Sequence, residues 1–428
     1  MHNGTRTSRS GICLAVILLL LTASAWAQPA ASGQGQWFKG NTHAHSWFSD
    51  GDSPPEMVIE WYRSHGYHFL VMSDHNSVNE TERWVQPGKK AKPKTIAAYE
   101  TTYGPDWVDK RERDGATEYR LRSIGALCRK FDLPGKFLVV PGEEISDSVA
   151  NRPVHLNGLH LVETIRPQGG KTVGQSVRNN IRAVLAQGEK AGRPVLVHVN
   201  HPNFGWALTA EDLAPIPQLR FLEVQNGHGG VRNDGDKEHV SVERMWDIIL
   251  SQRLGALRLP VVFGLATDDM HVLDPQASGA PPGRGWIMVR AAALTPADLL
   301  AAMERGDFYS STGVTLNHVR FENDTLAIDI EARPGVEYKT QFIGTLKDYD
   351  TTVTPQKDEK GNPVTGKYSD DIGKILAEQD GPRASYKLTG RELYVRARVI
   401  STAKHPNPPA AGDVERAWTQ PVRPASRG

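Results

Sequence analysis

Short runs of apolar and β-branched residues alternate with amphipathic segments up to about residue 312. The runs predict strands, because β-branched and aromatic residues bounded by turn residues are typical of buried strands; they span 37–42, 67–73, 136–141, 154–161, 194–199, 220–225, 261–266 and 286–289. Between many of them, apolar residues recur at helical spacing, which predicts helices over 55–65, 173–191, 242–254 and 296–305. Alternation of this kind predicts an α/β fold with a mainly parallel sheet, most economically a closed or distorted barrel.

Two stretches depart from this pattern. Residues 80–114 contain the run Lys89-Lys90-Ala91-Lys92-Pro93-Lys94 and predict a solvated insertion. After Thr312 the strand-like segments 314–322, 325–331, 340–344 and 394–400 follow one another without helices, and the tail from Thr402 is rich in Pro and Ala. We therefore expect a barrel over residues 37–313, a small C-terminal all-β domain over 314–422, and an irregular tail.

The beginning of the chain has the pattern of a secretory signal peptide. Arg6 and Arg9 precede an apolar run over 12–21, and small residues end in Ala25-Trp26-Ala27. Residues 1–27 are thus expected to be removed, which would leave a periplasmic or secreted protein; the alternative is a retained anchor. No later segment reaches 18 apolar residues, so we expect no stable membrane anchor.

Composition excludes several classes of function. The chain has 50 Lys and Arg against 49 Asp and Glu, a net charge of +1, so it offers no basic face and no nucleic-acid partner is expected. Two cysteines exclude a disulfide framework, zinc fingers and iron–sulfur clusters, which need more thiols. The 15 histidines are the residues that stand out.

Several of these histidines fall near acidic residues where predicted strands end. The motifs are His43-Ala44-His45 followed by Asp50, Asp74-His75, Glu143-Glu144, His155, His198 to His201 before Pro202, and Asp268-Asp269-Met270-His271. Because residues at i and i+2 of a strand share a face, His43 and His45 can bind one ion together, as can Asp269 and His271. In a parallel barrel the strand ends form one rim, where active sites lie.

Imidazole and carboxylate without thiolate suit zinc, iron or manganese. Eight or nine candidate ligands exceed what one ion needs, so the sequence predicts two or three clustered divalent ions. The alternative is that core hydrogen bonds satisfy each histidine separately. Clustered ions lower the pKa of a bridging water enough to supply hydroxide at neutral pH, so no protein nucleophile is required.

The order of the motifs resembles the PHP (polymerase and histidinol phosphatase) superfamily from about Asn41 to Gly313. The exported, carbaryl-hydrolase-like branch fits best, and Ala417-Trp418-Thr419-Gln420-Pro421 is also similar to that branch. The resemblance implies a distorted (β/α)7 PHP barrel. It also implies three metal positions, held by His43, His45, Glu144 and Asp269, by Glu144, His155 and His201, and by Asp50, His75 and His271.

Several assignments choose between neighbours. Glu144 is preferred to Glu143 because the motif is Gly-x-Glu, and His201 to His198 because it precedes Pro202. Asp269 is preferred to Asp268 because only Asp269 shares a strand face with His271. Asp74, His198 and Asp268 are then candidates to orient the ligands.

Two further residues are candidates for contact with substrate. His228 ends the segment Glu223-Val224-Gln225-Asn226-Gly227-His228, at another strand end, and Arg284 lies in a Gly-rich turn where it could bind an anion. A surface arginine is the alternative for Arg284.

The predicted activity is hydrolysis of a small-molecule ester. A phosphate ester is the first choice, since several metals can hold the entering and leaving oxygens in line. The alternative is a carboxylic or carbamate ester, and a non-catalytic metal-binding or envelope interaction protein is a third. The motifs of serine hydrolases (Gly-x-Ser-x-Gly) and P-loop enzymes are absent from the sequence. The natural substrate and the oligomeric state stay open.

Overall fold

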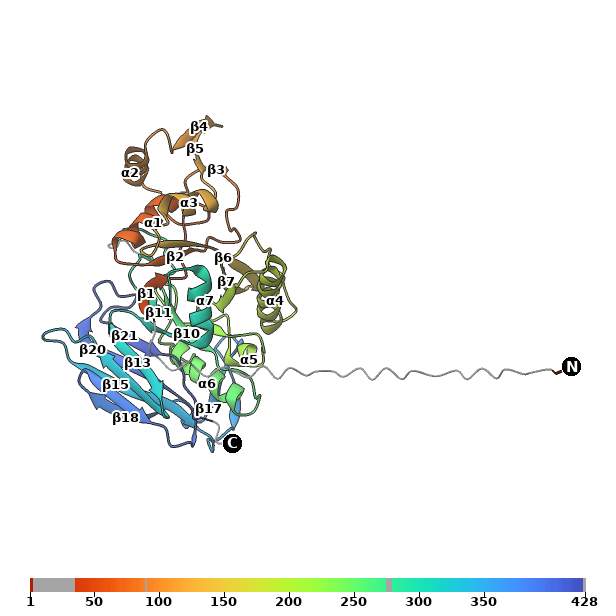
Figure 1. Cartoon of the computed structure of the whole chain (residues 1–428), viewed down its shortest axis with the longest axis vertical. Coiled ribbons are helices and arrows are strands. Elements are labelled where there is room, and N and C mark those ends of the chain that lie inside the picture. The colour runs from red at the N-terminus through yellow and green to blue at the C-terminus, as the bar shows by residue number, and fades with distance from the viewer. Residues whose placement is uncertain (3–34, 89–90, 275–278, 426–428) are drawn as a thin grey trace.

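The computed structural model describes residues 1–2, 35–88, 91–274 and 279–425 (Figure 1). Its main feature is a 13-stranded mixed sheet. In sheet order the strands are β10 (Phe263–Thr267), β9 (Phe221–Asn226), β8 (Leu196–Val199), β7 (Arg152–Leu159), β6 (Leu138–Val149), β2 (Phe69–Met72), β1 (Gln36–Asn41), β11 (Trp286–Ala291), β12 (Phe308–Ser311), β21 (Val414–Thr419), β20 (Glu392–Lys404), β15 (Tyr338–Leu346) and β18 (Lys374–Asp380).

Two parallel groups of strands, β10-β9-β8 and β6-β2-β1, carry the first half of the sheet. Strand β7 joins them and runs antiparallel to both neighbours. It follows β6 through a tight hairpin in which Ala150 and Asn151 have φ values of 49° and 64°, the conformation of the two-residue turns that suit β hairpins. The mixed α/β class is confirmed, but the expectation of a mainly parallel sheet is wrong. The β6–β7 hairpin and the antiparallel pairs β1–β11 and β11–β12 make the sheet mixed even within the predicted barrel.

The sheet curls toward closure at the ends of β1 and β10. One isolated parallel bridge joins Ala44 to Met270, just beyond these two strands. The outer edge of β1 is already paired with β11. On the side facing β12, the backbone of β10 is instead satisfied by a side chain, since Ala266 N donates to Ser310 Oγ (3.0 Å) and Ser310 Oγ donates to Gly264 O (2.8 Å). A closed seven-stranded barrel is not detected in the described part of the chain.

Helices cover the outside of the sheet. They are α1 (Pro55–Ser64), α3 (Ile124–Phe131), α4 (Val173–Ala191), α5 (Ala210–Leu213), α6 (Val242–Leu254) and α7 (Pro296–Arg305). Local capping explains why three of them have the predicted bounds. The side chains of Thr172, Ser241 and Thr295 accept hydrogen bonds from the first turns of α4, α6 and α7. Left-handed Gly192 and Gly306 end α4 and α7.

The insertion after Glu80 is structured, which corrects the expectation of a merely solvated segment. It forms the helix α2 (Pro93–Tyr103) and a small sheet in the order β3 (Arg83–Val85), β5 (Ala116–Leu121) and β4 (Asp109–Arg113). Trp107 Nε1 donates to the buried Glu56 carboxylate of α1 at 2.7 Å, which docks the insertion on the helical layer. Figure 1 shows it at the opposite end of the molecule from the C-terminal strands.

The C-terminal region is all-β, as predicted, but it is continuous with the main sheet through the β12–β21 pair. It adds a sheet of β13 (Leu316–Glu322), β14 (Thr325–Ile330) and β19 (Arg383–Lys387), and a hairpin of β16 (Val353–Lys357) and β17 (Pro363–Tyr368). The expectation of an irregular tail from Thr402 is wrong, because β21 pairs with both β12 and β20. The division at residues 313 and 314 stays a prediction.

The predicted signal peptide, apart from its first two residues, lies outside the described residues. Within the described ranges, none of the helices combines the length and the apolar character that crossing a bilayer requires.

Candidate metal centre

All nine residues predicted as ligands come together in four overlapping groups. Within each group one nitrogen or oxygen atom from every side chain lies within 4.8 Å of the others. The groups are His43, His45 and Glu144; His43, His201 and Asp269; His75, Glu144 and His155; and His45, Asp50, His75 and His271. These groups differ in part from the sets that the family resemblance implies. The set of Asp50, His75 and His271 gains His45, whereas His75 takes the expected place of His201 beside Glu144 and His155, and His201 groups with His43 and Asp269.

Strand direction explains how residues far apart in sequence meet. His43 and His45 follow β1, His75 follows β2, His201 follows β8, and Asp269 and His271 follow β10. Glu144 and His155 differ, since they lie within β6 and β7 and not beyond strand ends. Because β7 is antiparallel, the beginning of this strand lies beside the later part of β6, where His155 is opposite Ser146.

The inward face of the strands changes from apolar to polar toward this edge. On β9 Phe221 is followed two residues later by Glu223, and on β8 Leu196 is followed by His198; all four are buried. Residues two apart share a strand face, so the apolar layer lies beneath a layer of buried polar groups. This polar layer supports the candidate ligands from below.

Glu144 lies at the centre of the cluster and is 1% exposed. Its Oε1 is 3.1 Å from His155 Nδ1 and 3.1 Å from His201 Nε2. Its Oε2 is 2.9 Å from His75 Nδ1 and 3.4 Å from His45 Nε2. Burial acts to raise the pKa of Glu144, but the surrounding imidazoles, His43 foremost, hold it well below the ordinary value. The carboxylate is therefore ionised and shared among several histidines.

Three buried atoms beside Glu144 have no hydrogen-bond partner in the described part of the chain: His43 Nε2, His45 Nε2 and Asp269 Oδ1. Asp269 Oδ1 is 3.1 Å from His43 Nε2 and 3.2 Å from His45 Nε2. Buried polar atoms are normally satisfied, so three such atoms aimed at one point fit a bound cation. Nitrogen and oxygen donors are what zinc, manganese and iron accept.

Asp269 and His201 both have left-handed backbone conformations, with φ values of 50° and 24°. Side chains other than Gly adopt this region at a cost of free energy, and such strain is concentrated at functional sites. Each residue is the second one after the end of a strand, so the turn directs its side chain back over the sheet edge.

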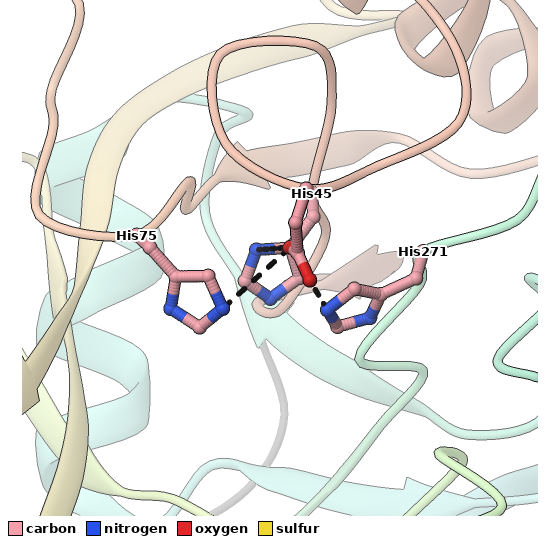
Figure 2. A group of neighbouring side chains, drawn as sticks. His45, His75 and His271 are labelled. Atoms are coloured by element: carbon pink, nitrogen blue, oxygen red, sulfur yellow. Dashed lines mark ion pairs between the residues drawn. The ribbon is translucent and has the colours of Figure 1, made fainter. Parts of the chain in front are cut away.

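The outermost group contains three imidazoles that point toward one another (Figure 2). The ring centroids of His45 and His271 are 4.1 Å apart and those of His45 and His75 are 4.5 Å apart. Asp50 Oδ1 is 3.2 Å from His271 Nε2 and 3.6 Å from His75 Nε2. The turn that brings Asp50 back requires Gly51, since a Cβ atom there would lie 2.7 Å from the backbone of Ser46.

The charges of the cluster favour cations. Burial and then the charge of His271 lower the pKa of His45 to about 3, so this imidazole is neutral and able to coordinate. Burial acts to raise the pKa of Asp269. The imidazoles, His43 foremost, outweigh this effect and hold the pKa well below its ordinary value. For His75, burial is outweighed by Glu144, and the pKa rises to about 9. A metal would displace this proton, so metal binding and proton release are linked.

Glu223 is a functional residue that the sequence analysis did not single out. Its Oε1 is 2.8 Å from His43 Nδ1, and its two oxygens also accept hydrogen bonds from Thr267 Oγ1, His201 N and Asn226 Nδ2. A carboxylate behind a ligating imidazole fixes the orientation of the ring. The available signal was an acidic residue inside the otherwise apolar strand Phe221–Val224, since a buried acid requires partners.

The three residues expected to orient ligands act differently. Asp74 accepts hydrogen bonds from Ser46 N, Ser46 Oγ and Ser49 Oγ and so holds the loop between His45 and Asp50. Asp268 accepts from Tyr62 OH and from the backbone of Arg284 and Gly285. His198 Nδ1 is 3.8 Å from Glu223 Oε1, and its role is to fill the polar layer.

We expect Glu223→Gln to weaken metal binding without unfolding the protein. Gln keeps one acceptor oxygen but removes the charge behind His43, and loss of such a partner typically costs about 10–100-fold in metal affinity. Competition with a chromophoric chelator measures the change, and the melting temperature reports the fold. Unchanged affinity would show that Glu223 does not orient His43 toward a metal.

His228 and Arg284, the candidates for substrate contact, have different surroundings. The half-buried His228 ring lies 5.2 Å from the His271 ring, at the edge of the cluster. Arg284 is 7% exposed, and its guanidinium donates to the backbone oxygens of Gly227, Gly279 and Asn407 and to Asn407 Oδ1. These contacts favour a structural role for Arg284, neither the anion contact nor the surface position that the sequence suggested.

Comparisons with known proteins give only distant likenesses. No protein-family profile matches the sequence, and no curated protein matches it either. Among solved structures, a two-domain protein from Bacteroides vulgatus containing a predicted PHP-like metal-dependent phosphoesterase has a TM-score of 0.40 at 12% identity, over 94% of this chain and 100% of that one.

Two further structures match smaller parts of the chain. A protein from Bifidobacterium adolescentis, to which metal-dependent phosphoesterase activity is attributed, has a TM-score of 0.29 at 15% identity, over 56% of this chain and 89% of that one. An amidohydrolase from Chromobacterium violaceum with bound sulfate has a TM-score of 0.31 at 12% identity, over 57% of this chain and 92% of that one. At these scores the likenesses decide neither the fold nor the activity of this chain.

Proposed function

We propose that the protein is a PHP-type metal-dependent hydrolase of small-molecule esters, with phosphate esters favoured. The observation that carries this proposal is the convergence of nine imidazole and carboxylate side chains from six strands, with three buried donor atoms aimed at one point. A histidine cluster that served only the core would have each ring satisfied separately.

We propose two or three divalent ions of zinc, manganese or iron, held by the sets that the family resemblance implies. His43, His45, Glu144 and Asp269 would hold one ion, Glu144, His155 and His201 a second, and Asp50, His75 and His271 a third. Bound ions of this kind supply Lewis acidity that activates water and polarises an ester bond. Shared between two sets, Glu144 would keep two of the ions close enough to act on one substrate.

Other residues of the chain position the ligands and contact the substrate. Glu223 holds the imidazole of His43, and Asp74 holds the loop that carries Asp50, so the ligands are positioned before substrate arrives. His228 is half-buried beside His271, and we propose that it contacts the substrate at the open side of the cluster.

A phosphate ester is favoured because several adjacent cations can neutralise its charge and hold entering and leaving oxygens in line. One observation favours the alternative, a carboxylic or carbamate ester. The Arg284 guanidinium is bound by protein carbonyl groups, and the ion pairs of the described residues join no arginine to the nine ligands. Neutral esters do not need such an arginine.

We further propose that the mature protein is exported to the periplasm or secreted, which rests on the pattern of residues 1–27. An exported enzyme with near-zero net charge is suited to small-molecule substrates and offers no polyanion surface.

Removal and return of metal tests the function. Purified protein comprising residues 28–428 is expected to contain two or three equivalents of metal by mass spectrometry and to hydrolyse nitrophenyl phosphate faster than nitrophenyl acetate. A chelator should abolish turnover, and added zinc, manganese or iron should restore it. His43→Ala should lose metal and activity together; a variant that keeps both would contradict the ligand assignment, and a faster acetate reaction would favour the alternative ester.

A further inference from the structure

A second cavity lies at the opposite end of the strands from the candidate metal centre. It has a volume of about 450 Å³, within the range of small-ligand sites, and none of the nine candidate ligands lines it. Phe263, the first residue of β10, is in its wall, whereas Asp269 follows the other end of that strand. Phe263 and Asp269 are separated by six residue steps. At about 3.3 Å per residue the two sites are therefore roughly 20 Å apart.

The cavity has an apolar interior formed by two parts of the chain. Phe263 and Phe308 come from the main sheet, and Val319 and Phe321 come from β13. Residues 420–424, which follow β21, close another side. A molecule bound here would therefore contact both predicted domains.

The polar wall of the cavity has an excess of positive charge. It contains five arginines against Glu304 and Asp307. The two carboxylates are already used, since Glu304 pairs with Arg220 at 3.6 Å and Asp307 pairs with Arg305 at 2.9 Å and Arg290 at 3.8 Å. The two remaining arginines, Arg258 and Arg423, have no carboxylate partner among the described residues.

Arg258 and Arg423 both line this cavity, and both residues are exposed. Burial, followed by the charge of Arg258, lowers the pKa of Arg423. Arg258 also has a left-handed backbone with a φ of 55°, a conformation in which Gly or Asn costs less. Two guanidinium groups placed together, one of them on a strained backbone, are complementary to an anion that binds between them.

We propose that this cavity binds an amphipathic monoanion, a small molecule with one carboxylate on an apolar hydrocarbon body. The carboxylate pairs with Arg258 and Arg423, and the apolar body covers Phe263, Phe308 and Phe321. The site is separate from the proposed esterase centre and does not depend on its activity.

Calorimetric titration of the mature chain with sodium decanoate tests the site. We expect one decanoate per chain and a rise in melting temperature of about 3 °C at a ligand concentration 100 times Kd. Inorganic phosphate, which lacks the apolar body, and octyl glucoside, which lacks the charge, should each bind at least about tenfold more weakly. Octyl glucoside binding as tightly as decanoate would overturn the anion site, and tighter binding of phosphate would overturn the apolar part.

The variant Arg258→Asn/Arg423→Gln should weaken decanoate binding at least about tenfold, since it removes both charges while Asn tolerates the left-handed backbone. Phe321→Ala on β13 should weaken it through the apolar body alone. Arg182→Ala, an exposed arginine of α4 outside the cavity, is the control and should leave binding unchanged. Metal content should be the same in all three variants. Decanoate affinity unchanged in the double variant, or many decanoates per chain, would overturn the proposal.

Discussion

Glu144→Gln is expected to abolish hydrolysis, with a loss of at least about 1,000-fold in kcat/KM, and to reduce the metal content to one equivalent or less. The glutamine has nearly the same shape but carries no charge. It also presents an NH₂ group to the imidazoles that now surround the carboxylate oxygens. Because Glu144 is shared between two proposed metal positions, its loss affects more than one ion. Metal analysis by mass spectrometry together with nitrophenyl phosphate kinetics measures both effects.

The neighbouring acid provides a matched control. Glu143 is 0% exposed and faces away from the cluster, where its Oε1 accepts a hydrogen bond from Ile165 N at 2.6 Å. Burial raises the pKa of Glu143 to about 8, so a neutral Gln is a small change there. Glu143→Gln should keep metal and activity within about twofold of the wild type. Equal losses in both variants would mean that disturbance of β6, and not ligation, explains the effect.

The choice between Glu143 and Glu144 shows what the sequence can predict. The Gly-x-Glu motif selected Glu144. Alternation along a strand places consecutive residues on opposite faces, so only one of the pair can reach the other motifs. Alternation was also the argument for pairing His43 with His45 and Asp269 with His271. These residues do lie together, but beyond the ends of β1 and β10 and not within the strands. The bounds of the helices could also be predicted from the sequence, because the side-chain caps of α4, α6 and α7 are local features of the sequence.

Other features depend on contacts between distant parts of the chain. The β6–β7 hairpin is decided by a turn at Ala150 and Asn151 that lacks the usual glycine, so the sequence does not separate it from a strand end. Strand β21 looked irregular because its pairing partners, β12 and β20, lie elsewhere in the sequence. The role of Glu223 requires knowing that β9 passes beneath His43. Such features follow from tertiary pairing and not from local propensity.

A buried ion pair joins α6, in the predicted barrel, to β20, in the predicted C-terminal domain. Arg396 is 1% exposed and donates to both oxygens of Asp247, from Nε at 2.8 Å and from Nη2 at 2.6 Å. Its Nη1 donates to Glu243 Oε1 at 2.8 Å. Burial acts to lower the pKa of Arg396, but the two carboxylates outweigh it and raise this pKa above the ordinary value. The guanidinium therefore stays charged and neutralises two acids in the interior.

Arg396→Met is expected to lower the free energy of unfolding by about 3–5 kcal/mol, because it leaves the carboxylate of Asp247 buried without its cation. Urea unfolding followed by tryptophan fluorescence measures the loss. Arg391→Met is the control: Arg391 and Asp348 are 67% and 69% exposed at 3.2 Å, and such a pair contributes about 0–1 kcal/mol. Adding Asp247→Leu to Arg396→Met should recover part of the loss, since the remaining acid, Glu243, keeps its ion pair with Arg398 at 2.9 Å.

The same variant decides whether residues 314–422 form an independent unit. If Arg396 couples α6 to β20, the wild type unfolds in one transition, and Arg396→Met either shifts this transition or splits it in two. A variant as stable as the Arg391→Met control would mean that this ion pair does not couple the two regions. Because β21 pairs directly with β12, we expect the single transition. The region after residue 313 then supports the barrel-like half, and its deletion would lower metal binding through loss of the fold and not through loss of a ligand.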